Sequence, residues 1–132
     1  MNRGRWLLAL VAALPVAAAC SDEPTRSADA GTVTLRLTTP HTDDGAVLFE
    51  VTGPPVEGAT PANASLQLFT RREGDSTIVG VVVGNISDGA VVELQVPDID
   101  EAAGYTARVI EVADRQNALR ASLTGYALTS AR

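Results

Sequence analysis

The feature that most limits how this chain can fold is an alternation of apolar and polar residues with a period of two. It begins at Thr32 and recurs after each turn signal. In the first two segments the apolar positions are Val33, Leu35 and Leu37, then Val47, Phe49 and Val51. Successive side chains of a strand point to opposite faces, so this spacing predicts half-buried strands over 32–38 and 46–52.

Further strands are predicted at 65–71, 77–83 and 90–96, with a short edge run at 56–59 and a last strand around Tyr126 and Leu128. The run TIVGVVV at 77–83 is almost continuously apolar, which predicts burial on both faces or a central position. Segment 105–113 fits either a helix or a strand, and its β-branched residues favour a strand. Asp88-Gly89 is typical of a tight hairpin turn.

About seven short strands separated by turn signals predict an all-β fold, an antiparallel β-sandwich of the immunoglobulin-like kind. We assign residues 32–132 to this one domain. Hydrophobic residues make up 45% of the 132-residue chain, which is enough for a packed core at this size. No internal repeat is visible.

The first residues have the order of an export signal. Arg3 and Arg5 precede an apolar run from Trp6 to Leu14, and the small residues at 17–19 precede Cys20. The run is shorter than the roughly 20 residues that span a bilayer. A buried core helix is the alternative, but Pro15 would break it. We therefore predict a signal peptide over residues 1–19.

Cys20 is the only cysteine, so an internal disulfide is excluded, and a metal site is disfavoured because His41 is the only histidine. The ending Ala-Ala-Ala-Cys resembles the lipobox of bacterial lipoproteins. The resemblance implies that Cys20 receives a diacylglyceryl group and becomes the acylated first residue of the mature protein. Ala17 stands where that family usually has Leu. The alternative is ordinary secretion, with cleavage after one of the alanines.

A lipidated Cys20 would anchor the protein to a membrane, because two or more acyl chains hold stably. In the lipoproteins that this chain resembles, Ser21 favours the outer membrane or the cell surface over the inner membrane. Residues 20–31 are polar and without period, as expected of a flexible tether.

The stretch from Val92 to Val112 contains Gly104, Tyr105 and Val109 in the order found in one crossing of an immunoglobulin-like or fibronectin type III-like sandwich. The resemblance implies that Tyr105 forms a tyrosine corner, in which its hydroxyl bonds to the backbone of the corner. The alternative is a residue of the rim. Residues 32–98 are also similar to bacterial cohesin-like sandwiches, modules that bind partner proteins at the cell surface.

Few residues point to chemistry. His41 lies on a predicted loop beside two aspartates, but no G-x-S-x-G nucleophile motif occurs. Asp98, Asp100 and Glu101 could ligate calcium, although a capped helical turn explains them better. Two glycosylation-type triplets, at Asn63 and Asn85, are interpreted as chance turns, and the pair at 71–72 near a hairpin tip is too small a patch to predict a ligand.

The net charge of -6 and the aromatic content of 4% disfavour nucleic-acid binding. We expect a lipid-anchored protein of the cell envelope that is not an enzyme and needs no cofactor or metal. Its expected function is to bind a partner, such as another envelope protein. The alternative is a structural component of an envelope assembly, joined through an exposed edge strand.

Overall fold

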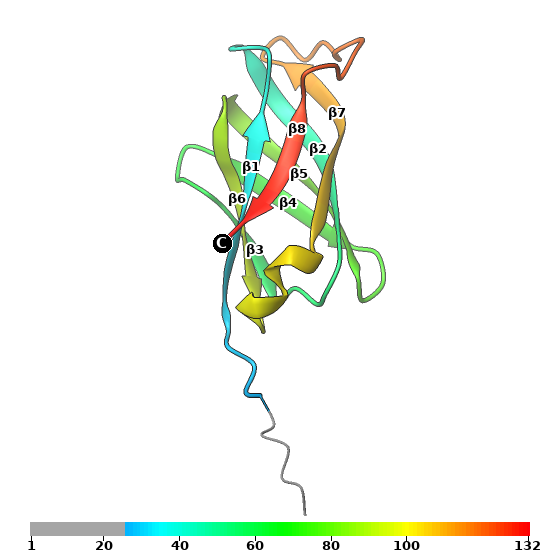
Figure 1. Cartoon of the computed structure of the whole chain (residues 1–132). Helices are drawn as coiled ribbons and strands as arrows, with labels where there is room; N and C mark the ends of the chain where they lie inside the picture. The colour runs from blue at the N-terminus through cyan, green and yellow to red at the C-terminus, as the bar shows by residue number, and fades with distance from the viewer. Residues whose placement is uncertain (1–25) are drawn as a thin grey trace, which may run out of the picture.

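The computed structural model describes residues 26–132, which form two four-stranded antiparallel sheets packed face to face (Figure 1). Sheet A contains, in spatial order, β3 (Gly58–Pro61), β6 (Gly89–Val96), β1 (Gly31–Thr38) and β8 (Ala127–Ala131). Sheet B contains β4 (Gln67–Arg72), β5 (Thr77–Ile86), β2 (Asp44–Thr52) and β7 (Thr106–Asp114). The short 3-10 helix η1 (Ile99–Gly104) lies between β6 and β7. The predicted all-β sandwich is confirmed, with eight strands rather than about seven, and it is compatible with an immunoglobulin-like fold.

The strands pair in a nested order, in which the first strand pairs with the last and the two middle strands pair with each other. β4 pairs with β5, β3 with β6, β2 with β7, and β1 with β8. Two further pairings, β1 with β6 and β2 with β5, complete the sheets. As a result, only the β4–β5 connection stays within one sheet, and each other connection between consecutive strands crosses from one sheet to the other.

The core lies between the sheets and is built from the alternating positions that the sequence indicates. Its fully buried members include Val33 and Leu35 of sheet A and Val47, Phe49 and Val82 of sheet B. Gly80 makes room for this packing, because a Cβ at that position would lie 2.5 Å from Cζ of Phe49. Any larger residue there would displace Phe49, the largest fully buried side chain.

Three local expectations are settled by the structure. Segment 105–113 is a strand, β7, as its β-branched residues favour. Gly89 has the positive φ expected of the Asp88-Gly89 turn, 128°, but the hairpin prediction is wrong, because β5 and β6 belong to different sheets. The apolar run at 77–83 lies in β5, the second strand of sheet B, with one face half-exposed.

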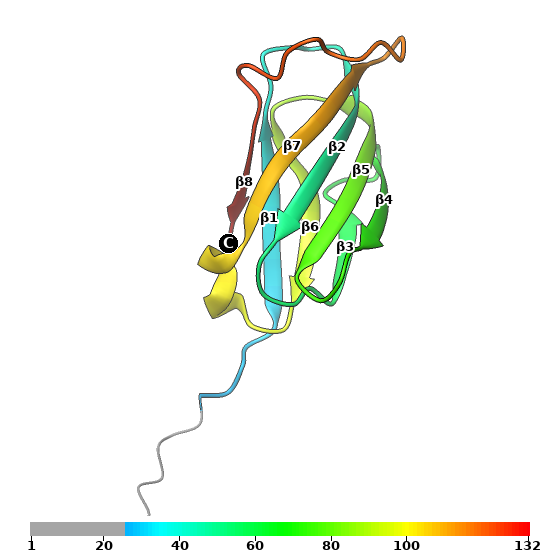
Figure 2. The ribbon, with the colours of Figure 1, turned by 90° about the vertical axis from the view of Figure 1, so that its right-hand side faces the viewer.

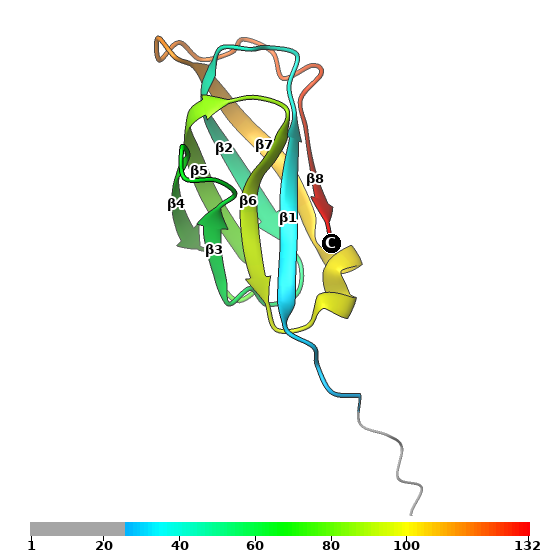
Figure 3. The same ribbon diagram turned by 90° about the vertical axis from the view of Figure 1, so that its left-hand side faces the viewer.

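The segment that precedes β1 is attached to η1. The backbone N–H of Ile99 donates to the carbonyl of Asp29 at 2.7 Å. Arg26 and Arg132 both form ion pairs with Asp100. The chain thus enters the sandwich beside η1, at the end opposite to the β1–β2 and β7–β8 connections (Figures 1 and 3).

The predicted signal peptide, Cys20 and the first part of the predicted tether lie outside the described residues. Within residues 26–132, the structure contains no helix long and apolar enough to cross a membrane.

Candidate functional site

The outer faces of the two sheets differ in chemistry. Sheet A, seen face-on in Figure 3, carries mostly polar side chains outward: Thr32, Thr34, Arg36, Thr38, Thr60, Glu93 and Gln95. Sheet B, seen in Figure 2, carries an apolar set that we call the outer apolar face: Leu48, Phe69, Val79, Val81 and Val83. Since neither set belongs to the core, folding alone does not explain the difference.

The strand register aligns the outer apolar face into rows. Phe69 of β4 lies opposite Val81 of β5, and Val81 lies opposite Leu48 of β2. Glu111 of β7 ends this row on the far side. Paired residues of antiparallel strands share one face and lie about 5 Å apart, so the apolar side chains are in contact range of one another.

Phe69 is the most exposed member of the outer apolar face. The residue is 61% exposed, whereas the other members are half-buried. It borders an open hollow of about 400 Å³ that is lined by Leu48, Phe69, Thr70, Arg71, Val79, Gly80 and Val81. A large aromatic side chain beside a shallow apolar hollow is the kind of surface that protein partners cover.

Charged side chains border the outer apolar face on one side. The next row contains Arg71, Val79, Glu50 and Arg108, in that order across the four strands. Arg108 Nε donates to Glu50 Oε1 at 2.8 Å, and Arg71 forms an ion pair with Glu73. The face therefore has an apolar centre and a polar border that carries both signs of charge, as protein interfaces do.

A second cluster lies at the opposite end of the sandwich from η1, around the buried carboxylate of Asp44. The carboxylate is fully buried and accepts hydrogen bonds from Arg120, from the Tyr126 hydroxyl at 2.9 Å and from Thr39 Oγ1 at 2.6 Å. Burial alone would raise the pKa of Asp44, but these hydrogen bonds and the charge of Arg120 outweigh it and hold the pKa below its ordinary value.

The Asp44 cluster is a structural site. Both carboxylate oxygens are taken up by donors, and among the described residues no buried side-chain polar atom lacks a hydrogen-bond partner. The cluster attaches the β7–β8 connection, which carries Arg120 and Tyr126, to the start of β2.

His41 is exposed on the β1–β2 connection, next to this cluster. Its backbone N–H donates to Thr39 Oγ1 at 3.0 Å, and its ring centroid lies 5.9 Å from that of Tyr126. Asp44, the one buried carboxylate among residues 26–132, accepts from Arg120. The arrangement thus gives His41 a stacking partner rather than a nucleophile.

The acidic residues after β6 form the capped turn that the sequence indicates. Asp98 is the N-cap of η1, and its carboxylate accepts from the backbone N–H of Asp100 at 3.0 Å. The Asp100 carboxylate is occupied by two arginines. Over residues 26–132, no three His, Cys, Asp or Glu side chains are grouped so that they could hold a metal ion.

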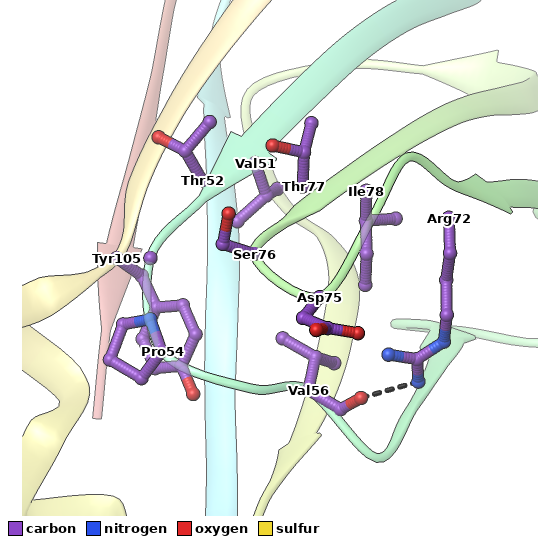
Figure 4. Close-up of a pocket in the computed structure, with 11 residues that line it drawn as sticks. Val51, Thr52, Pro54, Val56, Arg72, Asp75, Ser76, Thr77, Ile78 and Tyr105 are labelled. Atoms are coloured by element: carbon purple, nitrogen blue, oxygen red, sulfur yellow. Dashed lines mark hydrogen bonds between the residues drawn. The ribbon is translucent and has the colours of Figure 1, made fainter.

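Tyr105 is buried, and its hydroxyl donates to the carbonyl of Pro55 at 2.8 Å. This carbonyl belongs to the β2–β3 connection, so the bond joins two connections instead of closing the corner on itself as a tyrosine corner does. Burial and the nearby acidic charges of Glu101 and Asp98 raise the pKa of Tyr105, which keeps the hydroxyl a donor. Figure 4 shows the surrounding side chains, and the space they line is too narrow for a water molecule.

The remaining predicted positions are peripheral. Asn63 closes a local turn, since its side chain accepts from the backbone N–H of Ser65 at 3.0 Å. Asn85 lies in β5 and not in a turn, which corrects that interpretation. Arg71 and Arg72 end β4, next to the hairpin tip at 73–76, as predicted.

No protein-family model, curated protein or solved structure matches this chain. The resemblance of residues 17–20 to a lipobox stays a prediction, and so do the roles that it implies for Cys20.

Sequence reasoning missed both Phe69 and Asp44. The signal for Phe69 was present, because it alternates with Leu68 on a strand and lies opposite an apolar run. This signal identifies Phe69 as part of an apolar face only when the pairing of β4 with β5 is known. Asp44 was hidden by a β-bulge between Asp44 and Ala46, which turns the carboxylate inward, out of step with the alternation of Val47 and Phe49.

Proposed function

We propose that this protein is a lipid-anchored, non-catalytic interaction module of the cell envelope that docks a protein partner on the outer apolar face of sheet B. The observation that supports the proposal most is the exposure of Phe69, 61%, in a row of apolar side chains. Aromatic side chains that become buried at the centre of an interface contribute most of its binding free energy. The equivalent face of sheet A offers threonines instead.

The proposed anchor is compatible with this use of sheet B. The chain enters beside η1, at one end of the sandwich, and the ion pairs of Asp100 with Arg26 and Arg132 fasten that entry. A membrane attached through residue 20 would lie beyond that end. The broad face of sheet B would then point sideways, accessible to neighbours in the same envelope layer.

Docking through an edge strand is the second candidate. β4 pairs only with β5, and among the described residues its other edge makes no backbone–backbone hydrogen bond. Such an edge can accept a strand from a partner. However, Arg71 and Arg72 are exposed on this strand, and charged side chains on an edge are typical of strands protected against pairing. The outer apolar face is therefore favoured.

The anchor is tested by the variant Cys20→Ser. Lipidation predicts that the wild-type protein partitions into the membrane fraction and that the variant moves to the soluble fraction or stays in an unprocessed form. Metabolic labelling with a radioactive fatty acid should mark the wild type alone. A variant that is processed and membrane-bound like the wild type would exclude the lipid anchor.

The docking face is tested by site-specific photo-crosslinking in intact cells. A photoreactive phenylalanine analogue is placed at Phe69 and, as a matched control, at Thr34, which lies on the outer face of sheet A. We expect discrete crosslinked products from position 69 and none from position 34. Equal products at both positions, or none at 69, would contradict the proposal.

A further inference from the structure

We infer that the partner covering the outer apolar face is a second copy of this chain, packed face to face on sheet B. This inference depends on the proposed use of that face for docking. Two sheets that pack through their faces lie about 10 Å apart and keep their strands within about 30° of each other. Such a packing would bury Phe69 and the valines of β5 together.

The charged row beside the outer apolar face is self-complementary in one arrangement. A two-fold axis that runs along the strands, between β4 and β5, places β4 of each copy over β5 of the other. Phe69 then lies over Val81 of the second copy. β2 of the second copy lies one strand spacing, about 4.8 Å, beyond β4, which brings its Glu50 within reach of Arg71. The symmetry repeats this contact, so that the dimer contains two Arg71–Glu50 contacts, in addition to the ion pairs that Arg71 forms with Glu73 and Glu50 forms with Arg108 within each chain.

Another two-fold axis, across the strands through the row of Phe69, is disfavoured. It would place Glu111 of one copy against Glu111 of the other, because that residue ends the same row. It would also direct the two N-terminal segments to opposite ends. In Figure 2 the chain enters the sandwich at the end that carries η1. With the axis along the strands, the entry points of both copies lie at the same end, as needed if both are anchored in one membrane.

The size of the face indicates a weak dimer. In this arrangement only β4 and β5 of each copy lie over the other copy, and two strands about 4.8 Å apart with five residues of about 3.4 Å each cover roughly 150–200 Å². A stable interface buries about 800 Å² per partner, so association in dilute solution should be transient. Two anchors in one membrane would raise the effective concentration and favour the dimer.

The experiment is sedimentation velocity on protein made from the full chain, purified in a mild detergent and measured over a wide concentration range. We expect the wild type to associate as concentration rises. Phe69→Asp should weaken the association at least about tenfold, as the loss of an interface anchor does. Thr34→Asp, on sheet A, is the matched control and should associate like the wild type. Circular dichroism establishes that each variant is folded.

A charge exchange tests the geometry. Arg71→Glu and Glu50→Arg should each self-associate less than the wild type, because each homodimer contains two like-charged pairs. An equal mixture of the two variants should associate more strongly than either one alone, since both ion pairs of the mixed dimer are restored. A mixture no stronger than its components would overturn the proposed arrangement.

The outcomes separate this inference from the proposed function. A wild-type protein that stays monomeric at every concentration, while Phe69 crosslinks to a different envelope protein, overturns the dimer and leaves the docking face standing. A monomer that also gives no crosslink at position 69 overturns both.

Discussion

The buried carboxylate of Asp44 gives the sharpest stability prediction, through the variant Asp44→Asn. Asp44 is 0% exposed, and its two oxygens accept from Arg120, Tyr126 and Thr39. The amide keeps the shape of the side chain but removes the charge, and its NH₂ group replaces an acceptor with a donor. Arg120 then keeps only one ionised partner, the half-exposed Asp43, and loses the buried one.

The expected cost is large for one residue. Removing one partner of a buried ion pair typically costs about 3–5 kcal/mol. Single domains are stable by only about 5–15 kcal/mol, so the variant would lose about a fifth or more of a typical free energy of unfolding. At about 4 °C per kcal/mol for a domain of this size, the melting temperature should fall by roughly 12–20 °C.

Asp43→Asn is the matched control. Asp43 accepts from the same Arg120, at 2.6 Å, but its side chain is 49% exposed. Exposed ion pairs contribute about 1 kcal/mol or less. Urea unfolding followed by circular dichroism measures both variants, and an unchanged m-value shows that the unfolding free energies are comparable. If Asp44→Asn costs no more than Asp43→Asn, the assignment of Asp44 as the structural centre of this end of the sandwich is wrong.

Three further predictions concern stability. Because the folded-state pKa of Asp44 is lowered, the stability that its charge contributes is complete above the ordinary Asp pKa of about 4 and is lost as pH falls through the folded-state pKa. The difference in unfolding free energy between the wild type and Asp44→Asn should therefore become smaller in acid unfolding titrations. A difference that grows in acid would contradict the direction of the pKa shift. Gly80→Ala should lower the free energy of unfolding by about 1–3 kcal/mol in thermal unfolding, because the added Cβ would clash with the Phe49 ring. An unchanged free energy would mean that the Phe49 side chain can shift to make room for the Cβ. Tyr105→Phe should cost about 1 kcal/mol in chemical unfolding through the lost bond to Pro55, and no loss would show that water replaces the hydroxyl as its partner.

The strands themselves could be predicted because each strand carries its own signal. Val33, Leu35 and Leu37 alternate with polar residues, and all three are buried in β1. The turn at Asp88-Gly89 was also visible. The sheets to which the two flanking strands belong could not be predicted, because a short turn signal is the same whether the chain reverses within a sheet or crosses to the other sheet. That choice depends on contacts between residues far apart in the sequence.

The candidate sites could be predicted less well than the strands. Asp44 becomes buried because a β-bulge at 44–46 shifts the register, and its partner Arg120 comes from a connection 76 residues further along the chain. No local pattern connects the two residues. Tyr105 illustrates the same limit, because its burial follows from its strand, whereas its hydrogen-bond partner Pro55 lies 50 residues away.

The proposed docking depends on the outward positions of the strands, which the core leaves free. β1 uses Thr32, Thr34 and Thr38 at these positions, whereas β5 uses Val79, Val81 and Val83. Both residue types are β-branched and suit a strand, so the choice of valine adds little to strand formation. Valine on an open face does expose apolar area to water, and that area lowers the free energy only when another surface covers it. The valine face of β5, with Phe69 exposed beside it, therefore supports the proposed docking.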